Sequence, residues 1–145
     1  MLKFGFVVNT MLSPKRLKYR KQFRGVWRKI ATKGDKLAFG AYGLKSLEAG
    51  WIKDREIEAT RIVFARATKK AGKYWNRIFP DKPYTKKPPE VTMGAGKGDL
   101  DHYVASVSPG RVLFEIDGLS EVESRQVMKQ VASKLSVLTK FTVRA

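Results

Sequence analysis

The sequence lacks cysteine altogether and contains a single histidine among its 145 residues. Without cysteine, disulfides, thiolate metal sites and cysteine nucleophiles are excluded. The histidine, His102, lies close to Asp99 and Asp101, but the chain has no second histidine to share a metal and offers no compelling acid–base partner. We expect these three residues to form a turn with a solvated edge. We therefore expect no catalytic residue, no metal and no cofactor.

Long apolar stretches are also missing. None approaches the roughly 20 residues that are needed to cross a bilayer, so we expect no membrane partner. The apolar patch in "MLKFGFVVNT", residues 1–10, is too short for a convincing signal peptide. We expect this segment to be an extension before a start at Met11. An organellar targeting segment is the alternative, because residues 1–30 are rich in Lys and Arg and lack acids.

Acidic residues are scarce in the first two-thirds of the chain. Residues 1–97 contain 24 Lys and Arg against 7 Asp and Glu, whereas residues 98–145 contain 6 of each. The formal net charge of +17 therefore resides entirely in the first part, and a charge of this size attracts polyanions. Apolar residues make up 43% of the chain, enough for a buried core, so the protein is not a disordered basic tail.

Two segments have the periodicity of helices. The first is predicted from Arg55 to about Ala71, with Asp54 as its N-cap, Gly72 as its stop and an apolar stripe formed by Ile57, Thr60, Val63, Phe64, Ala67 and Ala71. The second begins at the capping box formed by Ser120 and Glu123. Its buried face contains Val127, Met128, Val131, Ala132 and Leu135.

The remaining patterns predict strands and turns. Strands are expected around Leu37 and Phe39, and at 73–80, 102–107, 111–116 and 139–145. Turns are expected at glycines 40, 43 and 50, a rigid loop at 81–90, and a hairpin turn at 108–110 between two of the strands. The order predicts an α+β fold with two layers, in which a mixed, largely antiparallel sheet carries both helices on one face.

The segment "SPKRLKYRKQFRGVWRK", residues 13–29, contains eight Lys and Arg and no acid. Tyr19, Phe23 and Trp27 recur every fourth residue, which would align them on one side of a helix against the core. So many like charges would repel each other in one helix. We therefore favour a basic arm that a polyanion orders.

The segment "MGAGKG", residues 93–98, resembles a phosphate-binding loop but fits neither nucleotide template. A Walker A loop needs a hydroxyl after its lysine, and Gly98 follows Lys97. A dinucleotide fingerprint needs a sixth-position glycine, where Asp99 stands. We therefore expect no small-molecule substrate. A plain glycine turn is one reading, and a flexible loop that approaches RNA phosphates is the other.

Cations interleaved with aromatic rings are typical of RNA-binding surfaces, and no motif favours DNA. The candidate RNA-binding residues are Lys15, Arg16, Lys18, Tyr19, Arg20, Lys21, Arg24, Trp27, Arg28, Lys29, Arg66, Lys69, Lys70, Lys73, Trp75, Arg77, Lys82, Lys86 and Lys87. The candidate loop residues are Met93, Gly94, Gly96, Lys97 and Gly98.

The segments "PKRLKYRK", "GAYGLKSLEAGW", "KKAGKYWNRIFPDKPYTKKP" and "MGAGKG" resemble, in order and spacing, the large-subunit ribosomal protein number sixteen family of bacteria and organelles. The resemblance covers about residues 11–142. It implies an α+β protein that binds large-subunit rRNA and helps to organise the aminoacyl-tRNA site near the peptidyl-transferase region. It also implies tRNA and neighbouring ribosomal proteins as partners, a glycine loop near the tRNA, and no enzymatic activity.

The chain departs from this family at three positions. Thr92 stands where the family usually has Arg, Ala95 where a second cation is common, and Asn76 where an apolar residue is usual. Thr92 and Ala95 leave the loop without two charges, so we expect it to hold RNA or tRNA more weakly.

The expected organisation is an extension at 1–10, a basic RNA-binding arm at 11–33 and a single α+β domain at 34–145. A bacterial cytoplasmic ribosome is the expected location, and an organellar ribosome is the alternative. The alternative function is that of a non-ribosomal RNA-binding regulator or subunit assembly factor.

Overall fold

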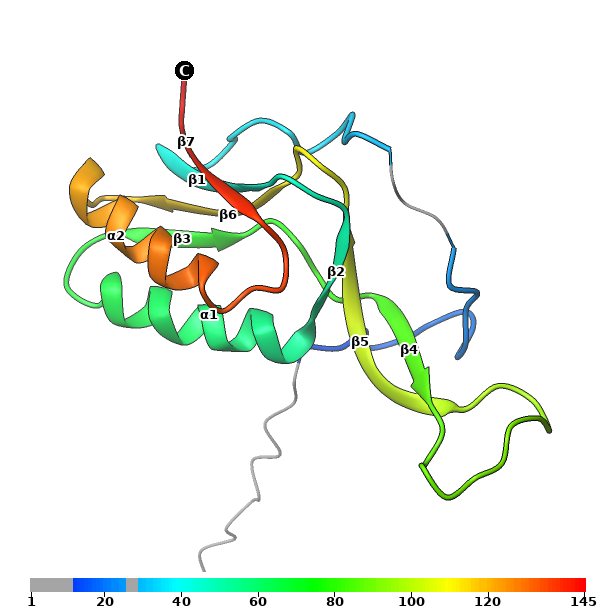
Figure 1. Ribbon diagram of the computed structural model, residues 1–145. Coiled ribbons are helices and arrows are strands. Elements are labelled where there is room, and N and C mark those ends of the chain that lie inside the picture. The colour runs from blue at the N-terminus through cyan, green and yellow to red at the C-terminus, as the bar shows by residue number, and fades with distance from the viewer. Residues whose placement is uncertain (1–11, 26–28) are drawn as a thin grey trace, which may run out of the picture.

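The computed structural model describes residues 12–25 and 29–145 (Figure 1). In this part of the chain the elements are β1 (Tyr42–Ser46), β2 (Gly50–Lys53), α1 (Asp54–Ala67), β3 (Lys73–Asn76), β4 (Lys82–Lys86), β5 (Asp99–Val107), β6 (Val112–Asp117), α2 (Glu121–Ala132) and β7 (Thr139–Val143). The predicted α+β class is confirmed. The described strands form two antiparallel sheets instead of one, with the orders β3-β6-β1-β7 and β2-β5-β4.

The core lies between the four-stranded sheet and the two helices, which cover the same face of that sheet (Figure 1). The inner strand β6 is buried from Val112 to Ile116. The Phe114 ring lies 5.3 Å from the ring of Phe64 on α1, which in turn stacks on Tyr74 of β3 at 5.1 Å. Burial of such aromatic and aliphatic side chains is the main source of stability.

Helix α2 begins as predicted, because the Ser120 hydroxyl accepts the Glu123 N–H and the Glu123 carboxylate accepts the Ser120 N–H. It ends at Ala132, so Leu135, which was predicted on its buried face, lies beyond the helix. Helix α1 is shorter than predicted and ends at Ala67, so Ala71 lies outside it and is exposed. The Thr68 hydroxyl donates to the Phe64 carbonyl at 2.8 Å and caps the helix there. At the other end Asp54 is the first helical residue instead of the N-cap.

Several predicted turns and strands are wrong. Gly43 and Gly50 lie inside β1 and β2 instead of in turns, and no strand forms around residues 37–39. The strand that begins at Lys73 ends at Asn76, four residues before Pro80. The predicted loop at 81–90 contains β4, which tolerates Pro83 because it is an edge strand of the three-stranded sheet.

The strands β5 and β6 do not form the predicted hairpin, because they belong to different sheets. The turn at 108–110 exists, with the Arg111 N–H donating to the Ser108 carbonyl at 3.1 Å, but it leads the chain from one sheet to the other. Strand β5 begins at Asp99, so His102 lies in a strand and not in the predicted turn. The paired strands β4 and β5 extend away from the helices as a ribbon with the glycine loop at its tip (Figure 1).

Candidate nucleic-acid interface

The described part of the basic arm, residues 12–25, contains neither helix nor strand. The helical alternative is therefore wrong for this segment. Tyr19 is 64% exposed and Phe23 is 94% exposed, so neither ring packs on the core. Every candidate cation between Lys15 and Arg24 is exposed. Trp27 and Arg28, which were also predicted to bind RNA, lie outside the described residues.

The arm meets the glycine loop at a small set of contacts. The Lys21 ammonium donates to the Lys97 carbonyl at 3.1 Å, and the Lys97 ammonium donates to the Gln22 carbonyl. The Lys21 ammonium also lies 3.8 Å from the Asp99 carboxylate at the start of β5. We call Lys21, Gln22, Lys97 and Asp99 the arm–loop junction. It brings together two predicted RNA-binding segments that are more than 70 residues apart in the sequence.

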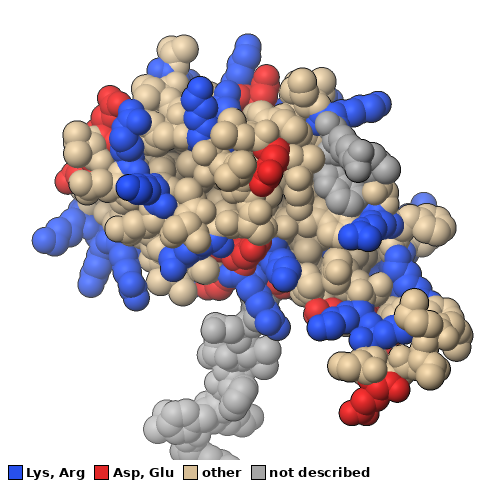
Figure 2. Space-filling model, in the orientation of Figure 1, with Lys and Arg blue, Asp and Glu red and all other residues tan. Residues whose placement is uncertain are grey.

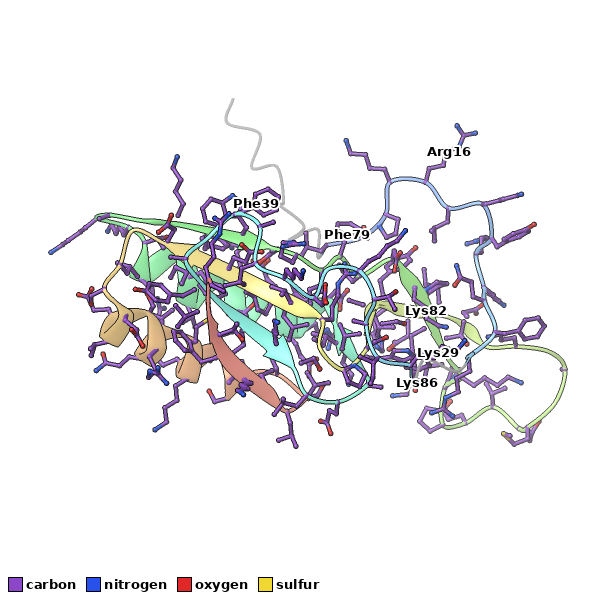
Figure 3. The ribbon with its side chains drawn as sticks, turned by 90° about the horizontal axis from the view of Figure 1, so that it is seen from above. Arg16, Lys29, Phe39, Phe79, Lys82 and Lys86 are labelled. Atoms are coloured by element: carbon purple, nitrogen blue, oxygen red, sulfur yellow. The ribbon has the colours of Figure 1, made fainter. Side chains whose placement is uncertain are left out.

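The arm also contacts the ribbon beside Trp51 of β2. The Lys82 ammonium donates to the Arg24 carbonyl at 2.7 Å, and the charged ends of Arg24 and Lys82 lie 5.6 and 5.3 Å from the Trp51 ring. Desolvation and then the charge of Lys97 lower the pKa of Lys82, although Asp81 acts in the opposite direction. Lys82 and Lys86 both belong to β4, and in Figure 3 Arg16 points outward from the arm. The ribbon is therefore strongly electropositive where the arm crosses it.

The tip of the glycine loop is open on both sides. Gly94, Ala95 and Gly96 have φ angles of 111°, 58° and 96°, and a Cβ atom added at either glycine would have no neighbour within 4 Å. Met93 is 95% exposed. The Lys87 ammonium donates to the Gly94 carbonyl and ties the tip to the end of β4. The loop therefore has room to approach a phosphate backbone closely, and glycine occupies two of its positions with positive φ.

The predicted residues do not all lie at this end of the molecule. Arg66, Lys69, Lys70 and Lys73 are exposed around the C-terminal end of α1, on the opposite side from the ribbon (Figure 1). Figure 2 accordingly shows Lys and Arg at both ends of the face that it draws. The structure thus divides the candidates into an arm-and-ribbon group and a helix-end group.

Arg77 and Trp75 are held by internal contacts. The Arg77 guanidinium pairs with the Glu115 carboxylate, and the Trp75 ring stacks on Phe39 at 6.0 Å. Glu115 is fully buried in β6 and also accepts the N–H groups of Ala38, Phe39 and Gly40, the last two at 2.7 Å each.

The Glu115 carboxylate therefore joins the segment after the arm to the central strand. Desolvation raises the pKa of Glu115, but the N–H groups of Gly40, Ala38 and Phe39 and the Arg77 guanidinium lower it by more, so the pKa lies below its ordinary value. Sequence reasoning missed Glu115. The only signal was a carboxylate inside the apolar run "VLFEI".

His102 is held by contacts with neighbouring side chains. Its Nδ1 atom lies 2.7 Å from the Asp101 carboxylate and its ring stacks on Tyr84 at 4.7 Å. The hydrogen bond from His102 is the largest cause of the lowered pKa of Asp101. In residues 12–25 and 29–145, no three His, Cys, Asp or Glu side chains are grouped so that they could hold a metal. No helix in the same residues is long and apolar enough to cross a membrane.

Comparison with known proteins places this chain among ribosomal proteins of the large subunit. Over 134 residues it is 54% identical to the large ribosomal subunit protein uL16 of Thermosipho melanesiensis, covering 92% of this chain and 94% of that protein. Over 134 residues it is 51% identical to the protein of the same name from Karelsulcia muelleri, covering 92% and 98%. A family model described as ribosomal protein L16p/L10e matches residues 14–142, and the chain belongs to this family.

This family membership confirms the resemblance that was inferred from the sequence motifs. It also decides between the enzyme and structural classes, because this family consists of structural ribosomal proteins and not of enzymes.

Proposed function

We propose that this protein binds large-subunit rRNA through its arm and ribbon and helps to organise the aminoacyl-tRNA site near the peptidyl-transferase region. The observation that carries the proposal is the arm–loop junction. It joins an exposed basic arm to an open glycine loop, so that the cations of the arm lie next to Lys97 in the stem of the loop. Cations on such a surface release counterions from RNA phosphates, and the irregular backbone follows folded RNA better than a single recognition helix would.

The glycine loop is the part that we assign to the neighbourhood of the tRNA. Its tip is open and glycine-rich, but Thr92 and Ala95 supply no charge there. The loop therefore contributes backbone shape and the cations of its stem, Lys87 and Lys97, and its hold on tRNA is correspondingly weak. Both of these lysines already donate to backbone carbonyls, and each ammonium group has further donors for a phosphate.

The two relatives are bacterial proteins, and on that ground we assign the chain to a bacterial ribosome, with rRNA and neighbouring ribosomal proteins as its partners. A free RNA-binding regulator or assembly factor would use the same surface. The names of both relatives favour the ribosomal constituent.

The arm is tested by removing its charge without touching the core. A variant in which four exposed arm cations become Gln changes Lys15, Arg16, Lys18 and Arg20. We expect weaker binding to large-subunit rRNA and a salt dependence that is flatter by roughly 0.7 to 0.9 ions for each phosphate that the variant no longer neutralises. The measurement is rRNA affinity over a series of salt concentrations, and circular dichroism checks that the fold is unchanged.

A matched control removes the same charge from the neutral end of the chain. The control changes four of the exposed cations there to Gln, namely Lys129, Lys134, Lys140 and Arg144. We expect this control to bind rRNA nearly as the unchanged protein does. If both variants have the same salt dependence, net charge alone governs binding and the arm has no special role.

A further inference from the structure

A hollow of about 610 Å³ lies where the arm crosses the stem of the glycine loop. It is lined by Tyr19, Lys21, Gln22, Phe23 and Lys97. Two aromatic rings open onto solvent here, and the Phe23 ring is 94% exposed with no polar atom of its own. Phe23 was not among the residues predicted to bind RNA. In the sequence, Phe23 is an apolar residue within a cationic segment, and its spacing from Tyr19 and Trp27 fitted a helix that packs on the core.

The position of the hollow is fixed by hydrogen bonds. The Lys21 ammonium donates to the carbonyl of Lys97, and the Lys97 ammonium donates to the carbonyl of Gln22, directly before Phe23. The two segments therefore hold each other in place and hold Phe23 at the rim. Each ammonium group keeps further donors, since it can make three hydrogen bonds. Two cations thus flank two exposed aromatic rings.

Exposed aromatic rings beside ammonium groups indicate which kind of ligand fits this hollow. An aromatic ring offers a flat apolar face to a nucleobase, and neighbouring ammonium groups offer charge and donors to the phosphate of the same nucleotide. The formal net charge of +17 favours an anionic partner over a basic or neutral one. A base inside a duplex has both faces covered by its neighbours, so only an unpaired base can enter.

We propose that this hollow binds one unpaired RNA nucleotide, with its base against Phe23 and Tyr19 and its phosphate at Lys21 and Lys97. The inference rests on the proposed function, since it assumes that the surface faces RNA. It adds a stacking contact with the face of a base. The surrounding cations, in contrast, would contact phosphates in RNA of any sequence. The contact is apolar, so its contribution depends little on salt.

Phe23→Leu in the full chain tests the proposal, because it removes the flat ring and keeps an apolar side chain. The probes are a short single-stranded RNA with one fluorescent adenine analogue, the same strand with abasic sites in place of bases, and a blunt RNA duplex. We expect the unchanged protein to quench the analogue. We expect the variant to bind the single strand about 5- to 100-fold more weakly, with the same salt dependence and unchanged duplex binding.

Phe79→Leu is the matched control. Phe79 is 49% exposed and lies away from the hollow, beside the four-stranded sheet (Figure 3). We expect it to leave single-strand binding unchanged. Because both side chains are exposed, neither variant disturbs the core. An equal loss from both variants overturns the proposal, since the effect would then be general to exposed rings.

Two further outcomes separate this inference from the proposed function. If abasic RNA binds as tightly as RNA with bases while binding still weakens with salt, the protein contacts phosphates and the nucleotide site is refuted. If no probe binds in a salt-dependent manner, the proposed function fails as well. A photo-reactive phenylalanine analogue at position 23 in assembled subunits should cross-link to RNA. Cross-linking to a neighbouring protein would instead make the hollow a protein contact and overturn the proposal.

Discussion

Glu115→Gln gives the most direct test of how the segment after the arm, residues 38–40, is joined to the core. The carboxylate is fully buried and accepts N–H groups from three successive residues, 38 to 40, and from the Arg77 guanidinium. Gln has nearly the same shape but carries no charge. Its NH₂ group is a hydrogen-bond donor, and it would face N–H groups that need an acceptor. The variant therefore breaks the ion pair and part of the backbone contact without leaving a cavity.

The expected loss follows from these contacts. Removing one partner from a buried ion pair costs about 3–5 kcal/mol, because the other charge is left uncompensated. The Arg77 side chain is 18% exposed and recovers some hydration, which favours the lower end of that range. We therefore expect the free energy of unfolding to fall by about 3 kcal/mol. For a chain of this length, that lowers the melting temperature by roughly 6–12 °C.

Denaturant unfolding of the protein and the variant measures this loss, and its pH dependence adds a second check. The pKa of Glu115 lies below its ordinary value of 4.5, so the folded carboxylate stays ionised at a pH where the unfolded one takes up a proton. Its contribution is complete above about pH 4.5 and is lost as pH falls through the lower, folded pKa. The difference between the two proteins should therefore be full at neutral pH and shrink in acid. A loss below about 1 kcal/mol at neutral pH would refute the ion-pair argument.

Two further predictions concern α2. Val131→Asp places an unpaired charge at a fully buried position and should unfold the protein or cost several kcal/mol, as measured by circular dichroism; Val122→Asp, at a position that is 69% exposed, should cost far less. Ser120→Ala removes the N-cap oxygen and should lower the free energy of unfolding by about 1 kcal/mol, whereas Ser120→Asp should retain most of it. Equal stabilities of the Ala and Asp variants would contradict the capping role.

Features that depend on neighbours in the sequence were predictable. The second helix was predicted from Ser120, Glu123 and the apolar spacing around Val131, and all three act as expected. The first helix was predicted with its buried face but ended too late. The helix ends where the Thr68 hydroxyl donates to the Phe64 carbonyl. The apolar spacing in the sequence continues beyond that residue, so it predicted a longer helix.

Features that depend on distant pairing were not predictable in the same way. Pro83 indicates a loop unless its strand is known to be an edge, and the turn at 108–110 indicates a hairpin unless β5 and β6 are known to lie in different sheets. Gly43 has the appearance of a turn residue, but it lies in β1, where a Cβ atom would come within 2.2 Å of the Leu37 side chain. A larger residue there would force the Leu37 side chain to move, and that contact is not visible in the sequence.

The candidate site shows the same division. The cationic segments were evident from composition, but their meeting at the arm–loop junction depends on the hydrogen bonds from Lys21 to Lys97 and from Lys97 to Gln22. The exposure of Phe23 could not be separated from core packing, because the four-residue spacing of the aromatic residues fits a helix equally well.

The position of the protein in the cell tests the central claim most directly. Sedimentation of a cell extract at moderate salt, followed by quantification of this protein across the gradient, measures where it resides. We expect it with the large subunit at about one copy per particle, released only as salt rises and competes for the phosphates. Protein found entirely in the free fraction, or present only on a small share of precursor particles, would contradict its role as a constituent of the ribosome.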